Sequence, residues 1–393
     1  MLDALRRKCL VACSRRHYSI SGHNSVSRNH LLEKYANRTP TPVSIQQMLS
    51  AQRGEGTSQW LQTELLIRLS RRYQDMHDLP VSLIATEHMK RVLRLYYNFF
   101  EDLSATDPQN NQEFIALLGR FYVADSGTLP SIAMGMREWQ SGSKADPELN
   151  ARLDDLFTSR LSTRMLIGQH LSLERDGKSR ITRGLVVSKV AEEAADSARR
   201  LCLGKFGVCP EIVIEGSEDF KFTYVDSHLH HMIFELTKNS VRAVVEQHHG
   251  ERGRERRKRL TLSSQGHLGP DGLPPVRVAI SGGKEDVVIK VSDEGGGIPR
   301  SEMSKIWSYE YTTAHESQQN EPLIASEVVS SASQEFITFR NNFYGMGYGL
   351  PIARVFARYF GGDLKVISTE GWGTDAYVFL NRLESTAIEV LPE

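Results

Sequence analysis

The chain has 393 residues, which is more than one hydrophobic core usually serves, so two domains are expected. Lysine plus arginine and aspartate plus glutamate both number 48. This balance excludes an overall field that would favour nucleic acid or an anionic membrane as a partner. Charged residues interrupt every apolar stretch before it reaches the roughly 20 residues that cross a bilayer, so no transmembrane segment is predicted.

The first 28 residues have the composition of a mitochondrial transit peptide. Five basic residues and one acid, Asp3, lie within positions 1–16, and the leucines there are spaced for one helical face. A basic disordered tail would have a similar composition, so the residues alone leave both interpretations open. We expect residues 1–28 to be a transit peptide and tail, and the mature protein to lie in the mitochondrial matrix.

Residues 29–184 are predicted to form a helical bundle. Apolar residues recur at helical spacing in stretches such as 60–69 and 92–100, and β-branched alternation is scarce. The predicted breaks between helices are Pro80, Pro108, Pro130 and residues 142–147. Several long helices with short breaks between them indicate an antiparallel bundle.

Residues 185–386 alternate between short β-branched runs and helical patterns. The predicted strands are 211–215, 276–280, 287–291, 364–367 and 376–380. The predicted helices are 187–203, 228–247 and 351–360. This order indicates an α/β sandwich whose helices lie on one face of the sheet.

Two segments of the second half do not fit this pattern. Residues 247–275 combine a run of basic residues with a Gly/Pro-rich stretch and have too little apolar content to fold alone. Either a solvated surface insertion or a basic docking patch would explain them. Residues 314–342 are rich in Gln, Ser and Asn and lie between two glycine motifs, so a mobile lid is predicted there.

One predicted helix of the second half carries a stripe of polar residues. Its members are His231, Glu235, Lys238, Asn239 and Arg242. The last four are spaced i, i+3, i+4 and i+7, so they project from one side of the helix, and the histidine lies one turn before the glutamate. Taken alone, such a stripe is also typical of the solvated face of an amphipathic helix.

Three glycine-containing motifs follow the stripe. Asp293 ends a predicted strand and can accept a hydrogen bond from an exocyclic amine, while Gly295 and Gly297 let the backbone fold tightly around a ligand. Residues 345–349 read Gly-Met-Gly-Tyr-Gly and open a helix whose free N–H groups can hold phosphate oxygens. Thr374, in the last motif, can reach a purine whose exocyclic amine is bound by Asp293. Each motif alone is compatible with an ordinary turn, and neither a Walker A nor a Rossmann pattern is present.

The order of these motifs resembles the ATP-binding boxes of the GHKL ATPases, which include histidine kinases and heat-shock protein 90. The motifs read Glu-x-x-Lys-Asn, Asp-x-Gly-x-Gly, Gly-x-Gly-x-Gly-Leu and Gly-x-Gly-Thr. The resemblance implies ATP and Mg²⁺, with the metal on Asn239, the adenine amino group on Asp293 and the phosphates on residues 345–350 under the lid. The nucleotide-binding residues that it implies are Asn239, Arg242, Asp293, Gly295, Gly297, Thr312, Thr313, Gly345, Met346, Gly347, Tyr348, Gly349, Leu350 and Thr374.

Further motifs narrow the resemblance to one GHKL family. Residues 159–170, 196–202, 290–298 and 345–364 look like those of the mitochondrial protein kinases, which act on pyruvate dehydrogenase or on the branched-chain 2-oxo acid dehydrogenase. Members join a four-helix bundle to a GHKL (Bergerat) α/β sandwich, which is the fold expected here, and phosphorylate a serine of the E1α subunit. The resemblance also implies the lipoyl domain of the E2 core as a partner and a homodimer.

The resemblance assigns catalytic roles to the polar stripe. Glu235 accepts the proton of the substrate serine, and His231 orients or tunes Glu235. Lys238 and Arg242 offset charge on the phosphates. The histidine is typical of pyruvate dehydrogenase kinases and favours that substrate, whereas the Tyr-Thr-Thr-Ala sequence at 311–314 leans toward the branched-chain pattern. The remaining alternatives are a branched-chain kinase, a GHKL module that binds ATP without phosphotransfer, and a chaperone-type ATPase.

Residues 122–125, Tyr-Val-Ala-Asp, depart from the family pattern. Animal members carry the arginine and histidine of an inhibitory pyruvate site there. We therefore expect pyruvate and dichloroacetate to inhibit this protein weakly.

Overall fold

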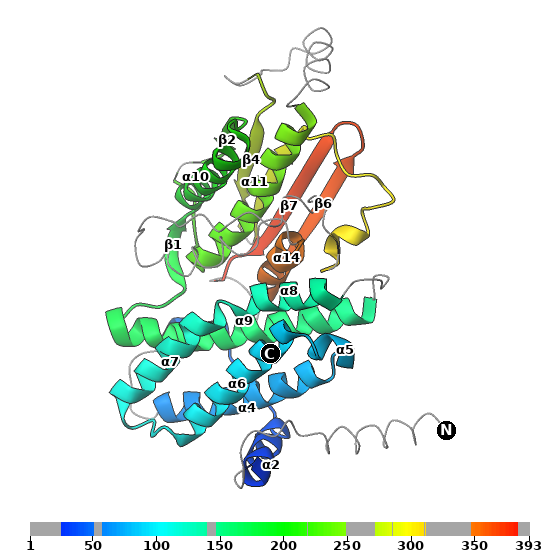
Figure 1. Cartoon of the computed structure of the whole chain (residues 1–393). Coiled ribbons are helices and arrows are strands. Elements are labelled where there is room, and N and C mark those ends of the chain that lie inside the picture. Colours follow the sequence, from blue (N-terminus) through cyan, green and yellow to red (C-terminus); the bar gives the residue numbers. More distant parts are fainter. Residues whose placement is uncertain are drawn as a thin grey trace.

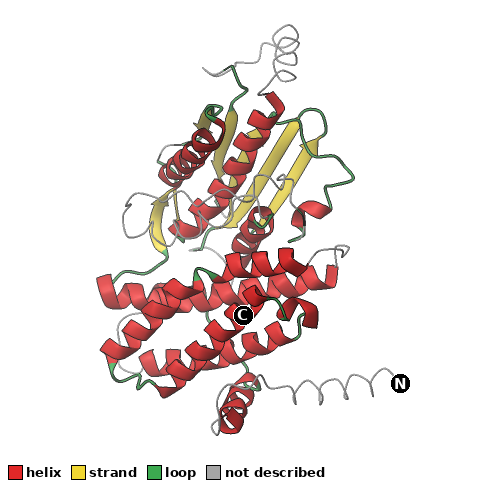
Figure 2. Cartoon of the chain, viewed as in Figure 1, coloured by secondary structure: helices red, strands yellow, loops and turns green. Residues whose placement is uncertain are grey.

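The computed structural model describes residues 25–50, 57–139, 147–217, 219–248, 272–284, 286–309, 311 and 347–383. A helical half and an α/β half lie against each other (Figure 1, Figure 2). The predicted lid at 314–342, most of the predicted transit segment and residues 249–271 of the predicted insertion lie outside the described residues.

The first half of the described chain is helical. Its elements are α2 (Ser25–Ala36), α3 (Ile45–Ser50), α4 (Thr57–His77), α5 (Val81–Ile84), α6 (Glu87–Ala105), α7 (Asn111–Asp125), α8 (Thr128–Trp139) and α9 (Pro147–Asp176). Short polar residues fix the starts of two of them, because the side chains of Thr86 and Asn110 accept hydrogen bonds from backbone N–H groups of the first turns of α6 and α7. These helices form the predicted bundle.

One predicted break is wrong. Pro130 lies inside α8, in its first turn, rather than between two helices. The N–H groups of a first turn have no acceptor within the helix, so a proline there costs no hydrogen bond. A proline at this place therefore does not end the helix.

Helix α9 joins the two halves. It runs from Pro147 to Asp176 and contacts α4 and α7 of the bundle as well as α14 (Gly349–Tyr359) of the α/β half. In Figure 1 it lies on the side of the bundle that faces the sheet. Its buried residues include the polar Arg160, Arg164, Gln169 and His170, which helices of a simple bundle rarely bury.

The second half is built around a mixed sheet. Its strands are β1 (Thr182–Val186), β2 (Ile212–Glu215), β3 (Lys221–Tyr224), β4 (Val276–Gly282), β5 (Asp286–Asp293), β6 (Asp363–Thr369) and β7 (Gly373–Asn381). Five of them form a sheet in the order β2-β4-β5-β7-β6, in which β2 and β4 are parallel and the other neighbours antiparallel. Strands β1 and β3, which the sequence analysis did not predict, form a separate antiparallel pair.

Helices cover one face of this sheet. They are α10 (Val187–Phe206), α11 (Asp226–His248) and α14, which lie in front of the strands in Figure 1. Val287, Ile289 and Val291 of β5 are fully buried, whereas the residues between them are partly exposed. This period-two alternation is the pattern of a sheet with one covered face, as predicted.

The ends of the predicted insertion 247–275 belong to the fold. His248 ends α11, is buried, and its Nε2 lies 2.8 Å from the carbonyl oxygen of Glu294. Leu273 is also buried. His248 thus contacts the chain just beyond β5, and Leu273 belongs to the hydrophobic core.

Candidate nucleotide and catalytic site

Helix α11 carries the polar stripe, and its first turns, with His228 and His231, face the bundle across a pocket. Glu235 and Lys238 are 3% and 8% exposed, and the Lys238 Nζ lies 2.5 Å from the Glu235 Oε2. A solvated helix face is therefore wrong for these two residues. Asn239 and Arg242 are half-buried, and the Arg242 Nε donates to Glu246. A buried carboxylate beside a buried ammonium is stable only as a pair.

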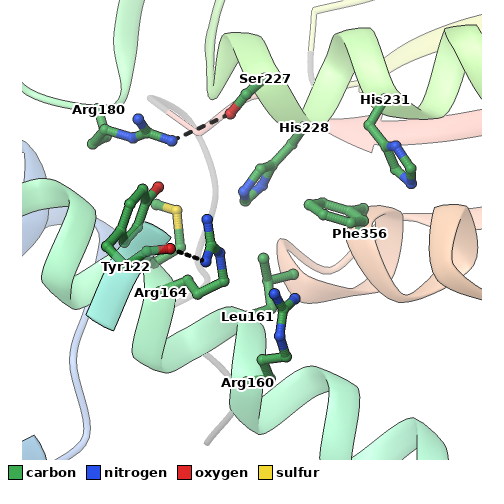
Figure 3. Close-up of a pocket in the computed structure, with 10 residues that line it drawn as sticks. Tyr122, Arg160, Leu161, Arg164, Arg180, Ser227, His228, His231 and Phe356 are labelled. Carbon is green, nitrogen blue, oxygen red and sulfur yellow. Dashed lines mark hydrogen bonds between the residues drawn. The ribbon is translucent and has the colours of Figure 1, made fainter. Parts of the chain in front are cut away.

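His231 lies one turn before Glu235 and is also buried. Burial lowers its pKa to about 4; Glu235 raises the pKa and Lys238 lowers it further. The imidazole is therefore neutral at neutral pH. Its ring lies against Phe356 of α14, with centroids 4.9 Å apart (Figure 3).

Asp293 lies at the end of β5 with both carboxylate oxygens engaged. Ser240 Oγ donates to Oδ2 at 2.7 Å, and the Gly295 N–H donates to Oδ1 at 2.9 Å. Burial raises the pKa of Asp293, and these hydrogen bonds oppose that rise. Thr374 is its partner in the β5–β7 register. The carboxylate is therefore fixed in place beside Thr374, as an adenine-binding acceptor would need to be.

Ser240 was missed in the sequence analysis. It directly follows Asn239 on α11, but no spacing within the helix shows that its hydroxyl reaches a strand 53 residues later in the chain. Only the packing of α11 on β5 brings the two groups together.

Gly297 is required by the close approach of two segments. Its φ is +70°, and a Cβ there would lie 2.1 Å from the Thr369 carbonyl oxygen. Any side chain would both strain the backbone and push β6 away. Gly295 lies in the same turn, against Ala243 of α11.

The next glycine motif meets the polar stripe directly. Gly349 begins α14, and a Cβ on it would lie 2.1 Å from the Glu235 Oε2. The N-terminus of α14, with its unpaired N–H groups and positive dipole end, thus lies against the buried carboxylate. Gly347 has a φ of +84°, Tyr348 is buried and Leu350 is partly buried. Thr312, Thr313, Gly345 and Met346 lie outside the described residues, so their roles stay predictions.

A pocket lies on the bundle side of the stripe (Figure 3). It is lined by Tyr122, Arg160, Leu161, Arg164, Met165, Arg180, Ser227, His228, His231 and Phe356. His231 is the residue that the pocket shares with the polar stripe. Residues 159–170 resembled a family motif in the sequence, but no local pattern there predicted a pocket.

Asp125 neutralises two of the pocket's arginines. Arg160 Nη2 and Arg164 Nη1 lie 2.8 and 2.9 Å from its Oδ2, and Tyr96 donates to Oδ1 at 2.7 Å. Burial alone would raise the pKa of Asp125, but the two guanidinium groups and the tyrosine hydroxyl hold it at about 2. A built-in carboxylate therefore already occupies this arginine pair.

No helix of the described part of the chain is long and apolar enough to span a membrane. Within the same ranges no group of three or more His, Cys, Asp or Glu residues could hold a metal ion.

Two family models match the chain. Residues 42–196 match the family described as mitochondrial branched-chain alpha-ketoacid dehydrogenase kinase. Residues 224–384 match the family described as histidine kinase-, DNA gyrase B-, and HSP90-like ATPase. The first match covers most of the helical half. The second covers α11, strands β4 to β7 and α14, with the polar stripe, Asp293 and the glycine motifs.

Curated relatives match most of the chain. A mitochondrial [pyruvate dehydrogenase (acetyl-transferring)] kinase of Arabidopsis thaliana is 37% identical over 83% of this chain and 85% of its own length. A kinase of the same name from Drosophila melanogaster is 33% identical over 95% and 90%. Isozyme 3 from Homo sapiens is 33% identical over 92% and 87%.

The chain belongs to the mitochondrial pyruvate dehydrogenase kinase family. It is therefore a mitochondrial kinase that uses ATP through its GHKL half. The predicted fold, a helical bundle followed by a GHKL α/β sandwich, is confirmed. The match at 42–196 also counts against the chaperone-type alternative, because such ATPases share only the second half with this family.

Proposed function

We propose that this kinase transfers the γ-phosphate of ATP to a serine of the E1α subunit of pyruvate dehydrogenase and thereby inactivates the complex. The observation that carries the proposal is the contact between Glu235 and Gly349. It sets a buried carboxylate against a helix N-terminus that suits phosphate oxygens. A base for the serine hydroxyl and a phosphate-binding backbone then adjoin each other.

The described residues support a division of labour. Glu235 would take the serine proton. Neutral His231 would orient that carboxylate without placing a second positive charge beside it, which would lower its basicity. Lys238 and Arg242 would offset the charge of the transferring phosphoryl group. Asp293 would accept from the adenine amino group.

The remaining nucleotide contacts follow the same scheme. Backbone N–H groups of Gly347, Tyr348, Gly349 and Leu350 would hold phosphate oxygens, and Thr374 would contact the purine beside Asp293. Gly295 and Gly297 would keep the backbone close to it. Thr312, Thr313, Gly345 and Met346 join this set through the family resemblance.

Asn239 fits Mg²⁺. Its half-buried amide lies on α11 one residue beyond Lys238, and an amide oxygen is a hard ligand of the kind Mg²⁺ takes. Mg²⁺ is usually held by one or two protein groups together with nucleotide phosphates and water, so no carboxylate cluster is needed. Bound there, the ion would offset phosphate charge.

Pyruvate dehydrogenase is favoured over the branched-chain enzyme as the substrate. His231 supports it, as do the names of the relatives described above. The description of the family that matches residues 42–196 and the Tyr-Thr-Thr-Ala sequence at 311–314 favour the alternative. The relatives carry more weight because they match most of the chain, including the polar stripe, whereas the family match at 42–196 ends before the stripe.

The partners follow from the same membership. We propose a matrix protein that binds the E2 lipoyl domain through the helical domain at 29–184 and forms a homodimer through the kinase domain at 185–386. The outward face of the sheet supports the dimer, since it carries Ile367, 61% exposed, near the partly exposed Tyr377 and Phe379. The expected weak inhibition by pyruvate or dichloroacetate is supported by Asp125, whose carboxylate already pairs with two arginines.

The test is transfer of label from [γ-³²P]ATP to purified pyruvate dehydrogenase E1 and, separately, branched-chain E1. Wild-type protein should label one serine of pyruvate dehydrogenase E1α, and Glu235→Gln, which keeps the shape but cannot take a proton, should abolish the label. Label on the branched-chain E1 alone would identify the branched-chain enzyme as the substrate instead. Tight ATP binding without transfer to either would support the binding-module alternative.

A further inference from the structure

Helix α9 of the bundle holds a segment of the kinase half. The Tyr309 hydroxyl donates to Asp154 Oδ1 at 2.5 Å, and its backbone N–H donates to Asn150 Oδ1 at 3.0 Å. Asn150 Nδ2 also donates to the Ser308 hydroxyl at 3.3 Å. Tyr309 is only 2% exposed. A buried residue just beyond η1 (Lys305–Trp307) is thus fixed to the bundle by directional, partly buried hydrogen bonds.

The same helix also contacts a residue of the phosphate motif. Phe157 of α9 packs against Tyr309 and Tyr348, with ring centroids 5.0 and 6.2 Å apart, and the two tyrosine rings are 5.2 Å from each other. We call Asn150, Asp154, Phe157, Tyr309 and Tyr348 the α9 anchor. It joins three segments that are far apart in the chain.

The α9 anchor adjoins the catalytic residues. Tyr348 directly precedes Gly349, where α14 begins and where the backbone meets Glu235. Tyr348 is buried, so its ring cannot move without repacking Phe157 and Tyr309. The position of the α14 N-terminus relative to Glu235 therefore depends on α9.

We propose that Asn150, Asp154 and Phe157 are positioning residues for the nucleotide site. They act through Tyr309 and Tyr348, which they hold so that the N–H groups at the start of α14 face the nucleotide phosphates. This inference rests on the proposed function for its catalytic readout. The bundle would thus contribute to ATP binding through α9, although the proposed nucleotide contacts belong to the α/β half.

The experiment uses the full-length protein and two readouts. Tyr309→Phe keeps the ring and removes the hydroxyl, and Asp154→Ala removes the acceptor. Both should weaken binding of a fluorescent N-methylanthraniloyl ADP and raise the KM for ATP by roughly three- to tenfold, with kcat changed less than about twofold because Glu235 itself is untouched. Asp154→Asn, whose amide oxygen can still accept from the hydroxyl, should restore most of the affinity.

Tyr96→Phe is the matched control. Tyr96 likewise donates a hydrogen bond to an aspartate, Asp125, but it joins two helices of the bundle, α6 and α7, and makes no contact with Tyr309 or Tyr348 that the structure shows. It should lower the Tm by a similar amount and leave nucleotide affinity unchanged. If Tyr309→Phe lowers the Tm in the same way and changes neither Kd nor KM, the α9 anchor only stabilises the interface and the proposal is wrong.

The two hypotheses fail differently. Wild-type protein that binds the fluorescent nucleotide but phosphorylates no E1 would overturn the proposed function. The comparison of Kd among Tyr309→Phe, Asp154→Asn and Tyr96→Phe would still decide whether α9 positions the site.

Discussion

The surroundings of His231 fix the protonation state of its side chain. Its imidazole is buried between α11 and Phe356, and its pKa is lowered to about 4. A neutral ring one turn before Glu235 does not compete with Lys238 for the carboxylate charge. The cost of this arrangement falls on folding at low pH.

We expect His231 to make folding stability fall between neutral and acidic pH. Its pKa is depressed in the folded state, so the unfolded chain binds the proton more tightly, and stability is lost as the pH falls from about 6.5 toward 4. The loss between pH 7 and pH 5 should be about 2 kcal/mol. Urea unfolding of wild type and His231→Asn at both pH values measures it, and an equal loss in both proteins would contradict the assignment.

Ser240 is a second residue that we expect to act through a neighbouring side chain, Asp293. Its hydroxyl donates to Asp293 at 2.7 Å and orients the carboxylate. Ser240→Ala should raise the KM for ATP about threefold to tenfold, since one hydrogen bond to a charged group is lost, while kcat stays near the wild-type value. Steady-state kinetics with varied ATP tests this, and an unchanged KM would mean that the backbone N–H groups of Gly295 and Thr374 suffice to orient Asp293.

At the scale of elements, the start of α14 and the middle of α11 are the pair that matters most. Gly349 leaves no room for a side chain beside Glu235. The atom that a Cβ would meet is the end of a flexible side chain, so the fold can accept the change by moving the carboxylate.

Gly349→Ala should therefore cost activity rather than stability. Displacing Glu235, the proposed base, should lower kcat at least about tenfold, with the Tm nearly unchanged. Gly204→Ala is a suitable control, because a Cβ there meets nothing within 4 Å and the residue lies in helix α10. That variant should gain about 0.5–1 kcal/mol and keep full activity. Loss of activity in both variants, or in neither, would refute the role of Gly349.

The contact between α7 and α9 depends on Asp125. Asp125→Asn leaves Arg160 and Arg164 buried without their counter-ion and should cost about 3–5 kcal/mol of unfolding free energy at pH 7. The carboxyl has a pKa of about 2, so its contribution is complete above about pH 4 and fades as the pH falls through 2. Asp196→Asn, in the exposed pair with Arg199, should cost less than about 1 kcal/mol. Similar costs measured by urea unfolding would contradict this difference.

At the scale of the whole molecule, the sheet has one covered and one outward face. The covered face packs on α10, α11 and α14, and the outward face presents Ile367 on β6. A sheet face with exposed apolar residues is costly in water unless a partner covers it. A second copy of the chain is the partner that family membership supports.

Ile367→Lys should convert a dimer into a monomer in analytical ultracentrifugation, because it places a charge in the contact. Nucleotide affinity should be unchanged, since Asp293 and Glu235 of the proposed site are buried on the covered side of the sheet. Val123→Lys alters an apolar residue that is 73% exposed on α7 and should leave the dimer intact. Wild-type protein that sediments as a monomer would rule out the dimer.

Much of the architecture follows from local patterns in the sequence. The short β-branched run at 287–291 predicted the strand β5, and the apolar spacing of α11 predicted a helix that presents Glu235, Lys238 and Asn239 together. Such patterns are readable because burial of one face imposes a period of two or 3.6 on the chain. The short β1 and β3 strands escaped prediction, since four or five residues carry too little pattern to distinguish a strand from a loop.

The sequence by itself determined which chemical groups this kinase has and their order along the chain. The tertiary structure decided which of them meet: Gly349 with Glu235, Ser240 with Asp293, and Tyr309 and Tyr348 with α9. These pairs join segments that are distant in sequence, and no local period encodes such contacts. They arise only when helices and sheet pack together, because close packing fixes positions that no single element can fix alone.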